Sequence, residues 1–167
     1  MKKLYALLVI LIILYIGINV GANNLPFGDS TALNTTDNAN AGISTGNINF
    51  PKIDNFTDNK INDTAVSYRD ANYNMTINVS TVDNSQSVAD IASGLLSSGR
   101  YTSNQTIDQN GVTTYFLYNE GSESYSADIY FSKDNQNFLI SGEGISYENS
   151  DYFINHCKNV IDAIGSK

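Results

Sequence analysis

The sequence predicts an α+β fold: an N-terminal transmembrane helix, then an antiparallel sheet of about five strands packed with two helices. Three observations predict it. Apolar and polar residues alternate with the period of a strand in several segments, apolar residues recur at helical spacing in two others, and an uncharged apolar run stands near the start of the chain. The segments follow in the order strand, helix, four strands, helix. Because short turns join the four strands, we expect them to run mainly antiparallel.

The N-terminal segment is predicted to enter a membrane. Lys2 and Lys3 precede the uncharged apolar run LYALLVILIILYI, and the apolar character continues to Val20. A helix of this length reaches the lower limit for spanning a bilayer. The two lysines hold its start in the cytoplasm, so everything after it is placed outside. We therefore expect a single-pass protein that contacts the lipid bilayer through residues 4–20.

Two interpretations of residues 1–22 stay open. The apolar run is longer than a typical signal core, which favours a retained anchor. Small residues at Val20, Gly21 and Ala22 are of the kind that signal peptidase requires, so a cleaved signal and a secreted protein are the alternative. Both interpretations place the rest of the chain outside the cytoplasm.

Residues 23–60 are predicted to form a flexible polar linker. The segment is rich in Asn, Thr, Asp and Gly, and its apolar residues have no fixed spacing. It cannot bury enough apolar surface to offset the entropy cost of ordering it. A denser set of apolar residues leaves open that its last third lies against the domain as an irregular arm. These residues are Ile48, Phe50, Ile53, Phe56 and Ile61.

The extracytoplasmic domain is predicted to span residues 61–167 and to open with a strand and a helix. Apolar and polar residues alternate over residues 73–81, which indicates a half-buried strand. The period then changes to helical spacing. A helix is expected from an N-cap at Ser85 or Ser87 to a left-handed cap at Gly99.

Four strands follow, and the turn between the first two is the best-specified local structure. Asn110-Gly111 readily adopts the two positive φ values of a type I′ turn, which predicts a hairpin of residues 106–109 and 112–119. Residues 125–132 alternate as a third strand. Residues 138–141 are expected to form a short fourth strand.

The end of the chain is predicted to be a helix that covers the sheet. Gly142 and Gly144 are expected to break the fourth strand before it. The helix starts from a cap at Asn149 or Ser150, keeps its apolar residues on one face and ends at Gly165. The two helices then pack either on the same face of the sheet or on opposite faces.

This order of elements resembles that of PsbP-like α/β sandwich domains, which combine a central antiparallel sheet with a long terminal helix. The resemblance covers residues 66–164 and is carried by the segments YNMTINVS, NGVTTYFLY and YSADIYFS and by the closing helix. It implies an accessory subunit of a membrane complex and transfers no catalytic residue. In composition and layout the chain is also similar to small, N-terminally anchored, Asn-rich envelope proteins of archaea.

Charge and composition exclude several classes of function. The formal net charge is −8 at pH 7 and basic residues form no run, so the chain repels phosphate backbones and no nucleic-acid partner is expected. The single cysteine, Cys157, excludes an internal disulfide. The single histidine, His156, leaves too few residues for a His-based metal site or a Ser-His-Asp triad. We expect no cofactor.

Two features offer chemistry, and each has a simpler explanation. Cys157 lies on the apolar face of the last helix, where a buried inert thiol is the usual state and a reactive thiol is the alternative. Glu143 and Glu148 would supply paired carboxylates for acid–base catalysis, but a solvated turn explains them as well. Asp54, Asp58 and Asp63 lack the loop of a calcium site. We therefore predict no catalytic or metal site.

Tyrosines and asparagines supply the remaining candidate sites. Tyrosines of the predicted sheet would form a platform for sugars or peptides, with ordinary cross-strand packing as the alternative. These are Tyr115, Tyr118, Tyr125 and Tyr130. Six Asn-x-Ser/Thr sequences permit glycosylation without requiring it. Their acceptors are Asn34, Asn55, Asn62, Asn74, Asn78 and Asn104.

The sequence thus predicts a membrane-anchored, extracytoplasmic domain that binds or spaces a protein or carbohydrate partner and is not an enzyme. Two alternatives stay open. The first is an accessory subunit of a membrane complex. The second is a small enzyme or redox-sensitive domain that uses Cys157 or the pair of Glu143 and Glu148.

Overall fold

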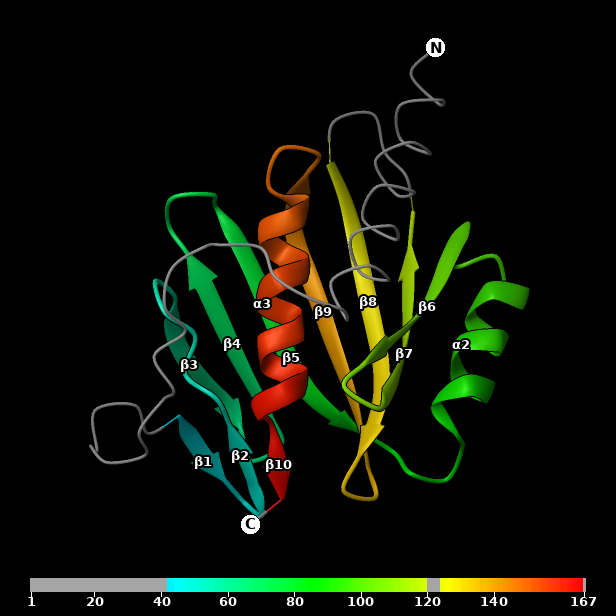
Figure 1. Ribbon diagram of the computed structural model, residues 1–167, viewed down its shortest axis with the longest axis horizontal. Helices are drawn as coiled ribbons and strands as arrows, with labels where there is room; N and C mark the ends of the chain where they lie inside the picture. The colour runs from blue at the N-terminus through cyan, green and yellow to red at the C-terminus, as the bar shows by residue number, and fades with distance from the viewer. Residues whose placement is uncertain (1–41, 120–123, 167) are drawn as a thin grey trace, which may run out of the picture. The chain divides into compact units, whose positions relative to one another are not determined.

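The computed structural model describes residues 42–119 and 124–166, which belong to one compact unit, Asp37–Lys167 (Figure 1). The predicted membrane segment, residues 1–22, lies outside the described residues. The same holds for residues 23–41 of the predicted linker. In the described ranges, no helix is long and apolar enough to cross a bilayer.

A seven-stranded sheet forms the centre of the domain, with the strand order β3-β4-β5-β9-β8-β7-β6 and antiparallel pairing throughout. This confirms the α+β class, and two further strands, β3 and β4, enlarge the predicted sheet. The strands are β3 (Thr57–Asn62), β4 (Ala65–Asp70), β5 (Met75–Val82), β6 (Ser103–Gln109), β7 (Val112–Tyr118), β8 (Ser124–Lys133) and β9 (Gln136–Ser146).

A smaller, three-stranded sheet joins the two ends of the described chain, in the order β1-β2-β10. Its strands are β1 (Ile43–Thr45), β2 (Ile48–Phe50) and β10 (Gly165–Ser166). The structure therefore corrects the predicted linker boundary at residue 60, because the first strand of the folded domain already begins at Ile43. Phe50 is 0% exposed and Ile53 is 5% exposed, so these residues pack into the core. Residues 51–56 lie against the domain without helix or strand, as the alternative of an irregular arm predicted.

The residues in the hairpin turns determine the geometry of those turns. Asn110 and Gly111 have φ values of 52° and 83°, which confirms the predicted type I′ geometry. The turn between β8 and β9 uses two further positive-φ residues, Asp134 (φ 51°) and Asn135 (φ 60°). Short polar side chains tolerate this conformation better than others, so the turn forms without glycine.

Strand β9 does not break at Gly142, contrary to the prediction. Gly142 pairs with Ile77 of β5 on one side and Ala127 of β8 on the other. A Cβ at Gly142 would lie 2.4 Å from Cε2 of Phe153, so the absence of a side chain lets the last helix approach the strand closely. The glycine is a packing site and not a strand end.

Within the described ranges the helices are α2 (Val88–Ser97) and α3 (Ser150–Ala163). The hydroxyl of Ser87 accepts a hydrogen bond from the Asp90 N–H and donates one to the Asp90 carboxylate, which confirms the predicted cap. Gly99 has the predicted positive φ, 74°. Helix α3 ends at Ala163 instead of Gly165, because the chain turns extended at Ile164 and enters β10.

The helices lie on opposite faces of the sheet. In Figure 1, α3 lies in front of the sheet, and α2 packs against β7 and β8. Alternation along the strands separates the faces: Phe131 of β8 belongs to the core under α3, whereas the adjacent Tyr130 belongs to the cluster under α2. The α3 core is the larger of the two and also takes in Phe50 and Phe56 from residues 43–56, which we call the N-terminal arm.

Candidate functional site

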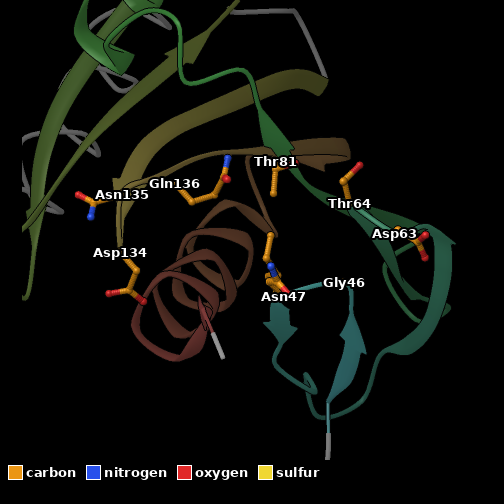
Figure 2. A pocket seen from close by; sticks show the side chains of 9 residues that line it. Gly46, Asn47, Asp63, Thr64, Thr81, Asp134, Asn135 and Gln136 are labelled. Carbon is orange, nitrogen blue, oxygen red and sulfur yellow. The ribbon is translucent and has the colours of Figure 1, made fainter.

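A polar pocket opens where several turns of the domain meet (Figure 2). Its volume is about 560 Å³, within the range that small organic ligands occupy. Figure 2 shows Asp134, Asn135 and Gln136 on one side of the hollow and Asp63 and Thr64 on the opposite side. The complete lining is Gly46, Asn47, Ile48, Asp63, Thr64, Thr81, Asp134, Asn135 and Gln136.

One wall of the pocket is the β8–β9 turn, which α3 holds in place. Lys133 donates hydrogen bonds from Nζ to the carbonyl oxygens of Ile161 (2.9 Å) and Asp162 (2.7 Å) at the C-terminal end of α3. A cation at this end of a helix satisfies free carbonyls and complements the helix dipole. Gln136 donates from Nε2 to the Val82 carbonyl (3.1 Å), which fixes the turn to the end of β5.

The opposite wall is the turn between β3 and β4. Nζ of Lys60 lies 2.6 Å from the Asp63 carboxylate. The hydrogen bond and the charge of this lysine hold the pKa of Asp63 below its usual range, so the carboxylate is ionised at neutral pH. Thr64 donates from its N–H (2.8 Å) to Oδ1 of Asn62, which closes the turn. The side chains of this wall are exposed.

The pocket offers amides, hydroxyls and carboxylates around a small apolar floor. Asn47 and Asn135 each carry both a donor and an acceptor, and the Thr81 hydroxyl can do both. Gln136 Nε2 and the Thr64 hydroxyl already donate within the fold, so these two side chains offer their oxygens as acceptors. The side chain of Ile48 is 8% exposed. The lining carries two carboxylates, Asp63 and Asp134, and no basic side chain, which makes the pocket less favourable for anions than for neutral groups.

A second polar cluster is centred on Asp128, under the C-terminal end of α2. Asp128 is 8% exposed and accepts hydrogen bonds from the hydroxyls of Tyr101 and Ser141, the latter at 2.7 Å. The Arg100 guanidinium lies 4.0 Å away. Burial and the bond to Asp128 raise the pKa of the Tyr101 hydroxyl. These bonds join three segments internally, which favours a structural role.

A third cluster joins the N-terminal arm, the β4–β5 turn and α3. Asp70 is 0% exposed and accepts hydrogen bonds from the Asn72 N–H (2.7 Å) and the Tyr152 hydroxyl (2.6 Å). Burial alone raises the pKa of Asp70, but these hydrogen bonds outweigh it and lower the pKa. Burial and the same bond raise the pKa of Tyr152 to about 12.

His156 completes this third cluster. Its ring meets those of Tyr152 and Phe56 edge-on, with ring centroids 4.3 Å and 4.9 Å away. Nδ1 is buried and has no hydrogen-bond partner. Burial lowers the pKa of His156, although the charges of Asp70 and Asp54 act in the opposite direction.

The domain should lose stability in mild acid because of His156. The unfolded histidine takes up a proton near pH 6.5, whereas the folded one does so only at lower pH. Stability is therefore fully present above about pH 6.5 and falls as the pH drops below it. Urea titrations between pH 7.5 and 5 measure this slope. His156→Gln should flatten it, and an unchanged slope in that variant would contradict the assignment.

The predicted tyrosine face is not assembled as one surface. Tyr115 and Tyr130 lie on the α2 side and pack into its apolar cluster, with Tyr130 6% exposed. Tyr118 packs on the α3 side beside Phe116. The side chain of Tyr125 lies outside the described atoms. Cross-strand packing accounts for the three described tyrosines.

Cys157 is 1% exposed and packs in the core under α3. Burial raises the pKa of its thiol well above the usual range, which disfavours the reactive thiolate. We expect the folded protein to resist alkylation by iodoacetamide at pH 8 for hours, and the protein in 6 M guanidinium to react within minutes. Mass spectrometry of timed samples measures both rates. If the folded and the denatured protein were alkylated at equal rates, the thiol would be accessible and the alternative of a redox-sensitive domain that uses Cys157 would be favoured again.

The other acidic candidates occupy separate positions, all exposed except Asp58, which is half-buried. Glu143 lies on β9 and Glu148 in the turn before α3. Asp54 and Asp63 lie on turns at either end of β3, and Asp58 lies on the strand. In the part of the chain that the structure describes, no three acidic, histidine or cysteine side chains gather closely enough to hold a metal ion.

The glycosylation acceptors differ in access. Asn34 lies outside the described residues. Asn78 is half-buried in β5, which pairs with strands on both sides. The other four acceptors are exposed: Asn55, Asn62, Asn74 and Asn104.

Apart from Asp63, which was considered as a calcium ligand, the pocket residues were not among the sequence candidates. They come from turns that are far apart along the chain, and each turn alone has the composition of an ordinary polar loop. Asp134 and Asn135 lie in the polar run KDNQN, whose composition is typical of a turn but does not indicate a pocket.

Comparison with known proteins adds a likeness of fold. No protein-family model matches the chain, and no curated protein matches it. Among solved structures, the chain is similar to the solution structure of cyanobacterial PsbP (CyanoP) from Synechocystis sp. PCC 6803. The TM-score is 0.45 at 10% sequence identity, over 81% of this chain and 99% of that one. This likeness concerns the arrangement of elements and transfers no function.

Proposed function

We propose that this chain is a membrane-anchored, non-enzymatic protein whose domain binds uncharged carbohydrate outside the cytoplasm. The polar pocket carries the proposal. Its amides and hydroxyls both donate and accept hydrogen bonds, as sugar hydroxyls do, so the two sets of groups are complementary. The floor at Ile48 offers an apolar contact to the C–H groups of a sugar ring.

Charge and size favour a neutral sugar over other ligands. The two carboxylates of the pocket and the net charge of −8 disfavour acidic glycans and phosphates. A volume of about 560 Å³ is far larger than one ion needs. The placement outside the cytoplasm is supported by the N-terminal lysines and the apolar run that follows them.

Binding to a glycan array of neutral, acidic and amino sugars tests the proposal. The probe is the full chain in phospholipid nanodiscs, because detergents with sugar headgroups would compete for the pocket. We expect neutral glycans to bind, and acidic ones to give no signal. A chain that binds no neutral glycan, or that prefers acidic ones, would contradict the proposal.

A double variant assigns the binding to the pocket. Asn47→Ala and Asn135→Gly remove two lining amides, and glycine keeps the positive φ of 60° at residue 135. Losing about 1 kcal/mol per hydrogen bond should weaken binding about fivefold for each amide. Asn55→Gly, at an exposed positive-φ position (φ 67°) outside the pocket lining, is the matched control and should bind normally. Equal affinity of the double variant and the control would exclude the pocket.

A further inference from the structure

Strands β3 and β6 are the two edges of the seven-stranded sheet, and they differ in how well they are protected from pairing with another chain. Strand β3 carries Lys60 and a register shift between Lys60 and Asn62. A lysine and a bulge are devices that keep an edge strand from pairing with another chain. Strand β3 is therefore a protected edge.

Strand β6 has none of these devices. Its residues, SNQTIDQ, include no Lys, Arg, Pro or Gly, and its register with β7 is continuous from Ser103 to Gln109. No β6 residue belongs to the apolar cluster under α2, and the side chains of Asn104, Thr106 and Asp108 are exposed. In the described part of the chain, the outer side of β6 has no strand partner. Its free backbone groups form a seven-residue template for a further strand.

We propose that β6 pairs antiparallel with β6 of a second copy of this chain, with Thr106 on the twofold axis. In this register Asn104 faces Asp108 of the other copy, and Asp108 faces Asn104. Each amide can donate to the carboxylate opposite, and no two like charges meet. The same residues serve on both copies, as a twofold interface requires.

The self-complementary charge pattern favours a second copy over an unrelated strand. Asp108 is the only charged residue of β6. A shift of the axis to Asp108 would set two carboxylates face to face, so repulsion disfavours that register, whereas the register centred on Thr106 sets each Asp108 opposite an Asn104 amide. One ladder of seven residues buries less than a standard interface of about 1,600 Å². We therefore expect pairing that is weak in dilute solution and promoted by the high local concentration of an anchored chain.

Cysteine cross-linking of the full chain in its native membrane tests the pairing. Thr106→Cys places two thiols on the twofold axis, with Cβ atoms about 5 Å apart, and also removes the acceptor sequence of Asn104. We expect a disulfide-linked dimer after mild oxidation. Asn59→Cys, exposed on the protected edge β3, is the matched control for random collisions and should stay monomeric. Protection of the buried Cys157 from alkylation confirms that each variant is folded.

A mixed experiment tests the register. Cells that carry Asn104→Cys on one tagged copy and Asp108→Cys on the other should give a mixed dimer, and either variant alone should give none. Cross-linking of Thr106→Cys no greater than that of Asn59→Cys would overturn the pairing. Dimers formed by Asn104→Cys alone would overturn the register.

Discussion

Replacing Phe50 with alanine should lower the free energy of unfolding by about 3–5 kcal/mol. Phe50 is 0% exposed and belongs to the main core together with residues of β5, β9 and α3. Alanine would remove the ring and leave a cavity that the surrounding strands cannot fill. Tyr68 also donates a hydrogen bond to the neighbouring Pro51 carbonyl (2.7 Å), which limits how far the arm can collapse into that cavity. Urea denaturation monitored by circular dichroism gives the value.

An exposed isoleucine of the same region is the control for Phe50. Ile61 is 54% exposed, so Ile61→Ala should change stability by less than about 0.5 kcal/mol. A flexible linker would make both substitutions neutral. If Phe50→Ala lowered the free energy of unfolding by less than about 1 kcal/mol, residues 43–56 would behave as part of a flexible linker and not of the core.

Alanine at Gly142 should destabilise the domain by about 1–3 kcal/mol. The new Cβ would lie 2.4 Å from Cε2 of Phe153 and 2.6 Å from Cδ1 of Ile145. Both neighbours are 0% exposed, so neither can move away without disturbing the contact between α3 and β9. The melting temperature and the urea midpoint should both fall.

The same substitution at another glycine should have the opposite sign. Gly94 lies inside α2, and a Cβ there would meet nothing within 4 Å. Gly94→Ala should therefore stabilise the domain by about 0.5–1 kcal/mol, because alanine has the higher helix propensity. If both alanines shifted the melting temperature in the same direction, the close approach of α3 at Gly142 would be wrong.

The elements that the sequence predicts well are those whose information is local. The alternation before Asp83, the cap at Ser87 and the Asn110-Gly111 turn each involve neighbours in the chain, and the structure confirms all three. These signals fix the backbone before any tertiary contact forms. These local signals were sufficient to predict the order of helices and strands from β5 to α3.

The missed elements depend on residues far apart in the sequence. Phe50 and Phe56 look like isolated apolar residues in a polar segment, and only the core under α3 explains their burial. From the sequence alone, Gly142 indicates a strand break, and only its contact with Phe153 in the structure explains the glycine as a packing site. The pocket joins turns near residues 46, 63 and 134, which no local pattern connects. The predicted tyrosine face failed for a local reason: Tyr115 and Tyr118 are three residues apart on β7, so their side chains point to opposite faces of the sheet.

Lysine labelling of intact cells tests the central claim, that the domain lies outside a membrane which holds the N-terminal segment. The probe is a membrane-impermeant amine reagent, read by mass spectrometry of the membrane fraction. We predict that Lys60, whose side chain is 47% exposed, is labelled in intact cells. Lys2 and Lys3 should react only after the cells are opened, or be missing if the segment has been cleaved. Full-length chain in the soluble fraction, with Lys60 labelled only after lysis, would contradict the claim.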